Sequence, residues 1–227
     1  MKRIVLNIAA IILCTAMSAQ GRGPTIGMNM QLTVPTENFS ANYAGVPIGY
    51  GIQFAIPSGL GSMMEWGIDY SKNTLGSDNE QVTFQDGLNN LLAGDMSLKS
   101  QVNSYHAMGR FSPLNGPLRV YLDGYAGFRN FTTKSVLEYQ NMEGLDMQTI
   151  YVANRDLSFS YGWGAGAMLS LKRNLMFDVG FQKLKGGNVT MIDQNSIQIK
   201  PDGSTEFNFI QSTTDVLVPR VGLTLAF

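Results

Sequence analysis

The feature that most constrains this chain is an alternation of apolar residues with small or polar ones. In the segment 217–227 every odd position is apolar, while the even positions are mostly small or polar and include Arg220. The segment 157–171 repeats the pattern, with serine and glycine at most of its even positions. Successive side chains of a β-strand point to opposite faces, whereas no helix gathers such a set on one side. The alternation therefore predicts strands.

Six further segments alternate in the same way, so the sequence predicts eight strands: 26–34, 46–56, 63–71, 102–111, 118–131, 157–171, 175–184 and 217–227. Their lengths suit tilted strands that cross a bilayer. Tight links rich in Gly, Pro and Asn at 58–61, 113–117 and 172–174 alternate with longer links at 35–45, 72–101, 132–156 and 185–214. This predicts an all-β fold, a closed eight-stranded antiparallel up-and-down transmembrane β-barrel with short periplasmic turns and termini and four longer extracellular loops.

Two of the longer links carry patterns of their own. Phe84, Leu88, Leu91 and Leu92 recur at helical spacing and predict a short amphipathic helix above the barrel. The segment 201–203, Pro-Asp-Gly, separates 197–199 from 207–209 and predicts a hairpin that extends the strands beyond the bilayer.

The amino-terminal segment has the composition of an export signal. Lys2 and Arg3 precede an apolar run from 4 to 17, and small residues follow at 18–19. We expect residues 1–19 to be a signal peptide, and residues 20–227 to form the barrel domain. The single cysteine, Cys14, lies in the signal, so the mature chain has no thiol for a disulfide or metal site. A formal net charge of −1 gives no reason to expect a nucleic-acid partner.

A soluble β-sandwich would also alternate, so the composition of the two faces decides between the two folds. A sandwich shows charged residues on its outer face. Here the second face is rich in glycine, which suits the crowded interior of a narrow barrel. The apolar face carries aromatic residues that would form interfacial girdles, namely Tyr50, Trp66, Tyr70, Tyr105, Tyr161, Trp163 and Phe177.

With these features the chain from 21 to 227 resembles the small outer-membrane barrels of the OmpA transmembrane-domain and OmpX type, in the form common among Bacteroidetes. The resemblance implies a place in the cell outer membrane, with outer-membrane lipid, lipopolysaccharide and the outer-membrane assembly machinery as partners. Val221, Leu223, Leu225 and the terminal Phe227 resemble the signal that this machinery recognises, although the family favours an aromatic residue where Leu225 stands. One such fold hosts many functions, so the resemblance leaves the activity open.

The inward face is expected to hold four acids, Glu65, Asp69, Asp123 and Asp178, and four arginines, Arg110, Arg119, Arg129 and Arg220. An unpaired charge in an enclosed lumen is costly, so this balance predicts a salt-bridge network that plugs the barrel. The alternative is a charged constriction that conducts ions. Eight strands leave an interior barely wide enough for side chains, which favours the plug.

His106 is the only histidine, and it lies in the middle of a predicted strand with no partner motif beside it. Catalysis would also need a positioned nucleophile, so we assign no catalytic, cofactor-binding or metal-binding residue. The sequence therefore favours a non-enzymatic barrel that presents its extracellular loops or serves as an accessory subunit of a larger outer-membrane protein complex. A narrow porin-like channel and a lipid-modifying outer-membrane enzyme are the two alternatives.

Overall fold

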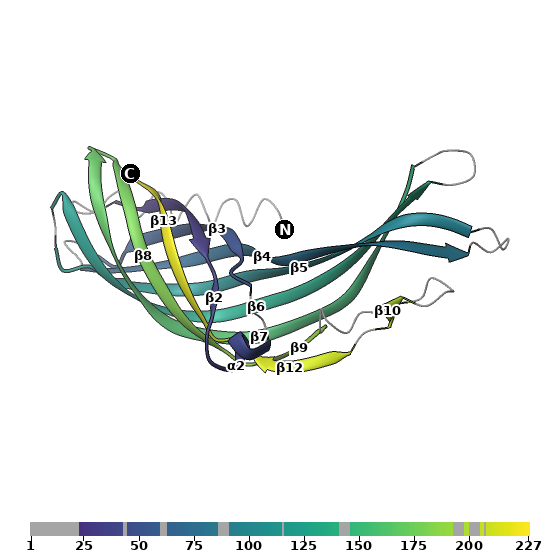
Figure 1. Ribbon diagram of the computed structural model, residues 1–227. Coiled ribbons are helices and arrows are strands. Elements are labelled where there is room, and N and C mark those ends of the chain that lie inside the picture. Colours follow the sequence, from purple (N-terminus) through teal and green to yellow (C-terminus); the bar gives the residue numbers. More distant parts are fainter. Residues whose placement is uncertain are drawn as a thin grey trace, which may run out of the picture.

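The computed structural model describes residues 23–42, 45–59, 63–85, 91–114, 116–140, 146–192, 198–199, 205–206 and 208–227. Eight strands form its barrel: β1 (Thr25–Leu32), β3 (Ile48–Pro57), β4 (Met64–Gln85), β5 (Leu91–Phe111), β6 (Leu118–Gln140), β7 (Asp146–Lys172), β8 (Leu175–Gly186) and β13 (Val216–Ala226). They pair antiparallel in this order, and β1 also pairs with β13, which closes the barrel (Figure 1). The predicted fold class is confirmed.

The two ends of the described chain meet on the side of the short turns. Thr25 of β1 lies opposite Ala226 of β13, and Arg173 and Asn174 alone connect β7 to β8. The predicted signal peptide lies outside the described residues, so its cleavage stays a prediction. No helix in the described part of the chain has the length and apolar character needed to cross a membrane.

The four strands β4 to β7 extend well past the end of the closed barrel, as Figure 1 shows. Strand β3 pairs with β4 only as far as Asn73, whereas β4 and β5 stay paired to Gln85 and Leu91. Strands β5 and β6 are paired out to Gly94 and Tyr139, and β6 and β7 out to Gln140 and Asp146. We call the part of these strands made of 74–85, 91–101, 132–140 and 146–155 the extracellular sheet.

The extracellular sheet corrects two sequence predictions. The links at 72–101 and 132–156 are mostly strands and not loops. The predicted helix is wrong, because Phe84 and Leu92 lie directly opposite each other in the β4–β5 pair, and Leu91 lies opposite Gln85; Leu88 is outside the described residues. In a hairpin, residues on opposite strands are paired by the register, and the eight-residue separation of Phe84 from Leu92 coincides with a helical spacing.

The shorter elements gather around the same end of the barrel. Helix α2 (Glu37–Asn42) follows β2 (Val34–Pro35), which pairs with β13. Strand β9 (Asn188–Ile192) pairs with β12 (Phe209–Thr213) and continues the β8–β13 hairpin beyond a break at Gly187. Strands β10 (Gln198–Ile199) and β11 (Thr205–Glu206) pair as a hairpin, but its second arm is 205–206 and not the predicted 207–209, because Phe209 pairs with Ile192 of β9. The Pro-Asp-Gly turn lies outside the described residues.

Candidate functional site: the barrel interior

All eight charged residues expected on the inward face are buried within the barrel. Their relative exposures run from 1% to 7%, and they come from strands β4, β5, β6, β8 and β13. The alternation places them there, because inward residues alternate with outward ones along every strand. The question that the sequence left open is which of these charges meet.

Four of the charges form one connected group at the centre of the lumen, which we call the central quartet: Asp69, Arg110, Asp123 and Arg220. Arg110 lies directly opposite Asp123 in the β5–β6 pair, and its Nε and Nη2 each donate to one carboxylate oxygen over 2.8 Å. Arg220 reaches across the lumen, with Nη2 at 3.2 Å from Asp123 Oδ2 and Nη1 at 3.5 Å from Asp69 Oδ2. Two acids and two arginines make the group formally neutral.

Neutral side chains, absent from the predicted set, add hydrogen bonds to the quartet, although Arg220 Nε and Nη1 have no hydrogen-bond partner among the described residues. Tyr125 donates its hydroxyl to Asp123 Oδ2 over 2.7 Å, while Gln53 and Gln182 donate to Asp69. The Arg110 guanidinium lies over the Tyr121 ring, 4.0 Å from its centroid. These residues share the inward parity of the charges, so the alternation that located the charges could also have located them.

Glycines make room for the largest of these side chains. A Cβ at Gly166 would lie 2.3 Å from the Tyr121 hydroxyl oxygen, and one at Gly180 would lie 2.5 Å from it. Both distances are far below van der Waals contact, so an alanine at either position would displace the ring. The inward glycines of β7 and β8 thus hold open the space that Tyr121 fills, and its hydroxyl donates to Asp178 over 2.7 Å.

The other charges are held nearer the two ends of the lumen. Arg119 and Glu65 form an ion pair toward the side of the short turns. On the opposite side the Arg129 guanidinium donates to the Thr214 carbonyl oxygen. Arg110, Arg119 and Arg220 therefore meet acids of the predicted set, whereas Arg129 donates to the backbone and Asp178 accepts from a tyrosine.

The single histidine lies beside a serine in the interior of the barrel. His106 Nε2 is 3.2 Å from Ser160 Oγ, and the two residues are 3% and 0% exposed. The Nδ1 atom of His106 has no hydrogen-bond partner among the described residues, so no carboxylate or carbonyl there orients the ring as in a catalytic triad. A serine nucleophile needs both an oriented base and a substrate that can reach it. The pair has the chemistry of a buried polar contact.

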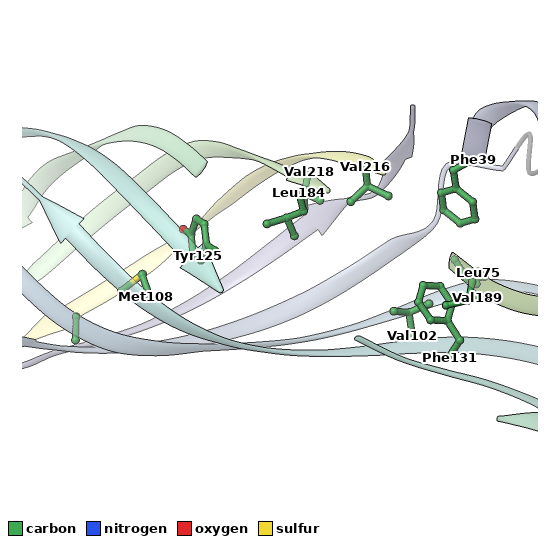
Figure 2. Close-up of a cluster of buried hydrophobic side chains, with 11 residues drawn as sticks. Phe39, Leu75, Val102, Met108, Tyr125, Phe131, Leu184, Val189, Val216 and Val218 are labelled. Atoms are coloured by element: carbon green, nitrogen blue, oxygen red, sulfur yellow. The ribbon is translucent and has the colours of Figure 1, made fainter. Parts of the chain in front are cut away.

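A group of buried apolar residues, absent from the predicted set, lies at the extracellular end of the barrel interior. Phe39 of α2 is fully buried and lies with Leu75, Val102, Phe131 and Val189 in one cluster. Figure 2 shows the Phe39 side chain directed from the helix toward Leu75 and Phe131. We call these five residues the apolar cap. Thr36 N, just before α2, donates to the Asp215 carbonyl oxygen, and Ser212 Oγ donates to the Asn38 carbonyl oxygen, which ties the helix to the β13 side.

The outer surface of the barrel has the opposite character to its interior. All eight strands expose large apolar or aromatic side chains. Most of the aromatic residues expected outside are more than half exposed, namely Tyr50, Trp66, Tyr105, Tyr161 and Trp163, whereas Phe177 is 38% exposed and Tyr70 is half-buried. Three of the four residues of the expected assembly signal, Val221, Leu223 and Leu225, also face outward in β13. Strands cross a bilayer only as a closed barrel with such a surface. The chain is therefore an outer-membrane β-barrel protein.

The described residues contain no group of three or more His, Cys, Asp or Glu side chains placed to hold a metal ion. No family model matches the sequence, and no curated protein matches it.

Several solved structures are similar in fold. Neisserial surface protein A is 11% identical, with a TM-score of 0.46 over 90% of this chain and 97% of its own. The outer membrane protein OprG from Pseudomonas aeruginosa is 14% identical, with a TM-score of 0.45 over 92% and 99%. Ail, the attachment invasion locus protein of Yersinia pestis, is 15% identical, with a TM-score of 0.37 over 90% and 96%. The likeness concerns the small barrel fold, and the finer assignment to an OmpX-like type from Bacteroidetes stays a prediction.

Proposed function

We propose that the protein is a non-enzymatic outer-membrane barrel with a plugged lumen, and that its function is carried by the extracellular sheet that it holds outside the membrane. The observation that carries this proposal is the filling of the interior at two levels. The central quartet spans the lumen from β4 and β5 through β6 to β13, and the apolar cap lies beyond it.

The central quartet supports a plug because its arginines are engaged on both sides. Arg110 uses two nitrogens on Asp123, and Arg220 bridges Asp123 and Asp69. An ion entering this level would have to replace those partners, and separating a buried ion pair costs several kcal/mol. A conducting constriction instead needs charges that bind a passing ion weakly and release it.

The apolar cap adds a barrier of a different kind. Water and ions gain no hydrogen bonds from a layer made of Phe39, Leu75, Val102, Phe131 and Val189, so a narrow passage lined by them would exclude both. The two levels act in series, and the loss of one would leave the other in place.

The extracellular sheet supports a role in presentation. Its segments are rich in Ser, Thr, Asn, Gln and charged residues, which suits a sheet that is largely exposed to water. Its strands keep their pairing far beyond the last residue of β3 that pairs with β4. A paired sheet presents side chains in fixed positions, as a binding surface for another macromolecule or for a larger outer-membrane assembly requires.

The enzyme alternative has one observation in its favour, the contact between His106 and Ser160, but both side chains are enclosed by the barrel. The channel alternative makes a different prediction, which planar-bilayer recording can test. We expect the purified wild-type barrel to show no single-channel steps at any voltage that the bilayer tolerates.

A positive control must distinguish a barrel that does not conduct from a barrel that has not inserted into the bilayer. The extracellular sheet should be accessible to protease added outside reconstituted vesicles while the barrel strands stay protected, which demonstrates insertion in the same preparation. Steady and reproducible current steps from protein inserted in this way would overturn the plug and establish the channel.

A further inference from the structure

Three cations lie on neighbouring strands on the outer face of the extracellular sheet. Lys99 of β5 lies directly opposite Lys134 of β6, and Arg155 of β7 lies opposite Thr132, the outward-facing neighbour of Lys134 on the same strand. All three side chains are exposed. We call this set the basic cluster.

The arrangement carries an electrostatic cost that an anion would remove. Like charges placed directly opposite on an antiparallel pair repel each other and destabilise it. Lys99 and Lys134 occupy such a pair, and Arg155 adds a third positive charge on the next strand. Asn130 anchors this third cation, since Arg155 Nε donates to its Oδ1 over 3.4 Å. A multivalent anion held between the three side chains would turn mutual repulsion into attraction.

The position of the basic cluster identifies where such an anion would come from. On the same strands and on the same outward face, the aromatic residues Tyr105, Phe128 and Phe159 lie opposite one another toward the membrane. The basic cluster lies farther from the periplasmic end on this same outward face. It is four to six residues beyond the aromatic residues, which is about 13–20 Å along the strands at 3.3 Å per residue. The anionic groups that reach this height from the side are those of the surrounding lipid.

We propose that the basic cluster binds the phosphate groups of the phosphorylated glycolipid of the outer leaflet, lipopolysaccharide. This inference rests on the proposed orientation, in which the extracellular sheet lies outside the cell. Lysine and arginine are the usual phosphate ligands, and the planar arginine fork can hold two phosphate oxygens at once. The bound glycolipid would brace the extracellular sheet against the membrane surface at the point where it leaves the barrel.

The test is binding of purified lipopolysaccharide to the full-length barrel in neutral phospholipid nanodiscs. The variant Lys99→Gln/Lys134→Gln/Arg155→Gln removes the basic cluster while keeping polar side chains at exposed positions. The matched control is Lys172→Gln/Arg173→Gln, which removes two exposed cations at the periplasmic end, from the last residue of β7 and the turn after it. Each basic residue near an anionic membrane surface contributes about 1 kcal/mol, so the loss of three predicts affinity lower by about a hundredfold, with the control unchanged.

Two further probes separate the sources of phosphate. Enzymatically dephosphorylated lipopolysaccharide should bind the wild type as weakly as intact lipopolysaccharide binds the triple variant, and inorganic phosphate should compete only at far higher concentration. Equal binding by the triple variant and the control, undiminished binding of the dephosphorylated glycolipid, or equally tight binding of inorganic phosphate would overturn the inference. None of these outcomes affects the plug, which stands or falls on the bilayer recording.

Discussion

Replacing Arg220 by alanine should destabilise the barrel by about 3–5 kcal/mol, the usual cost of leaving a buried charge without its partner. Arg220 bridges Asp69 and Asp123 inside the central quartet, and its side chain is 1% exposed. Asp123 would keep the two hydrogen bonds from Arg110. Asp69 would keep only the neutral amides of Gln53 and Gln182. The expected loss of stability therefore corresponds to one carboxylate left without a cationic partner, that of Asp69, and not to two.

This reasoning also predicts a rescue. The second substitution Asp69→Asn removes the stranded charge, so the double variant should be more stable than Arg220→Ala alone by about 1–3 kcal/mol, within the range that coupled neighbours show. A control change in the exposed turn, Arg173→Ala, should stay within about 0.5 kcal/mol of the wild type.

The assay is equilibrium unfolding in urea of the barrel reconstituted in lipid vesicles, followed by the fluorescence of Trp66 and Trp163. Both indoles face outward and would leave lipid for water on unfolding. If Arg220→Ala costs less than about 1 kcal/mol, or if Asp69→Asn worsens it further, the quartet does not work as a neutral unit and the argument for the plug loses its physical basis.

Two other predictions test the outer face and the export signal. An arginine at Val179 or Leu169, both about half exposed on the lipid side, should cost about 2–4 kcal/mol near the bilayer midplane, whereas Val179→Leu should be tolerated; wild-type stability of both arginine variants would refute the assigned face. Mass spectrometry of the protein from membranes should find Gln20 as its first residue, and a retained Met1 would show that the segment is not cleaved.

The sequence predicts which side chains point into the lumen, because successive residues of a strand point to opposite faces. Asp69, Arg110 and Arg220 are inward by parity alone, and the structure buries all three. Their partners were not predictable, since pairing depends on how neighbouring strands are offset. Arg110 meets Asp123 because the β5–β6 register sets them opposite, and that register depends on a turn geometry that the residue types of the link 113–117 do not specify by themselves.

The extracellular half was harder to predict for a physical reason. A strand segment that does not cross lipid needs no continuous apolar face, so the alternation weakens around Lys99 and Lys134 and the sequence there resembles that of a loop. Phe39 of the apolar cap lies in a short helix between strands, where no periodicity marks it as buried. Leu75, Val102 and Phe131 keep the inward parity of their strands and could have been assigned to the lumen.

The charged interior also explains how one chain settles on a single register. A slip by one residue would exchange the two faces of a strand, which would send Arg110 into lipid and Trp66 into the lumen. Each arginine on the lipid side costs about 2–4 kcal/mol near the midplane, and the crowded interior has no space for an indole. An apolar interior would carry no such penalty, because both faces would then tolerate lipid. The inward charges therefore specify the strand register even where their mutual pairing adds little net stability. Buried ion pairs can contribute in this way to the uniqueness of a fold without adding to its free energy of unfolding.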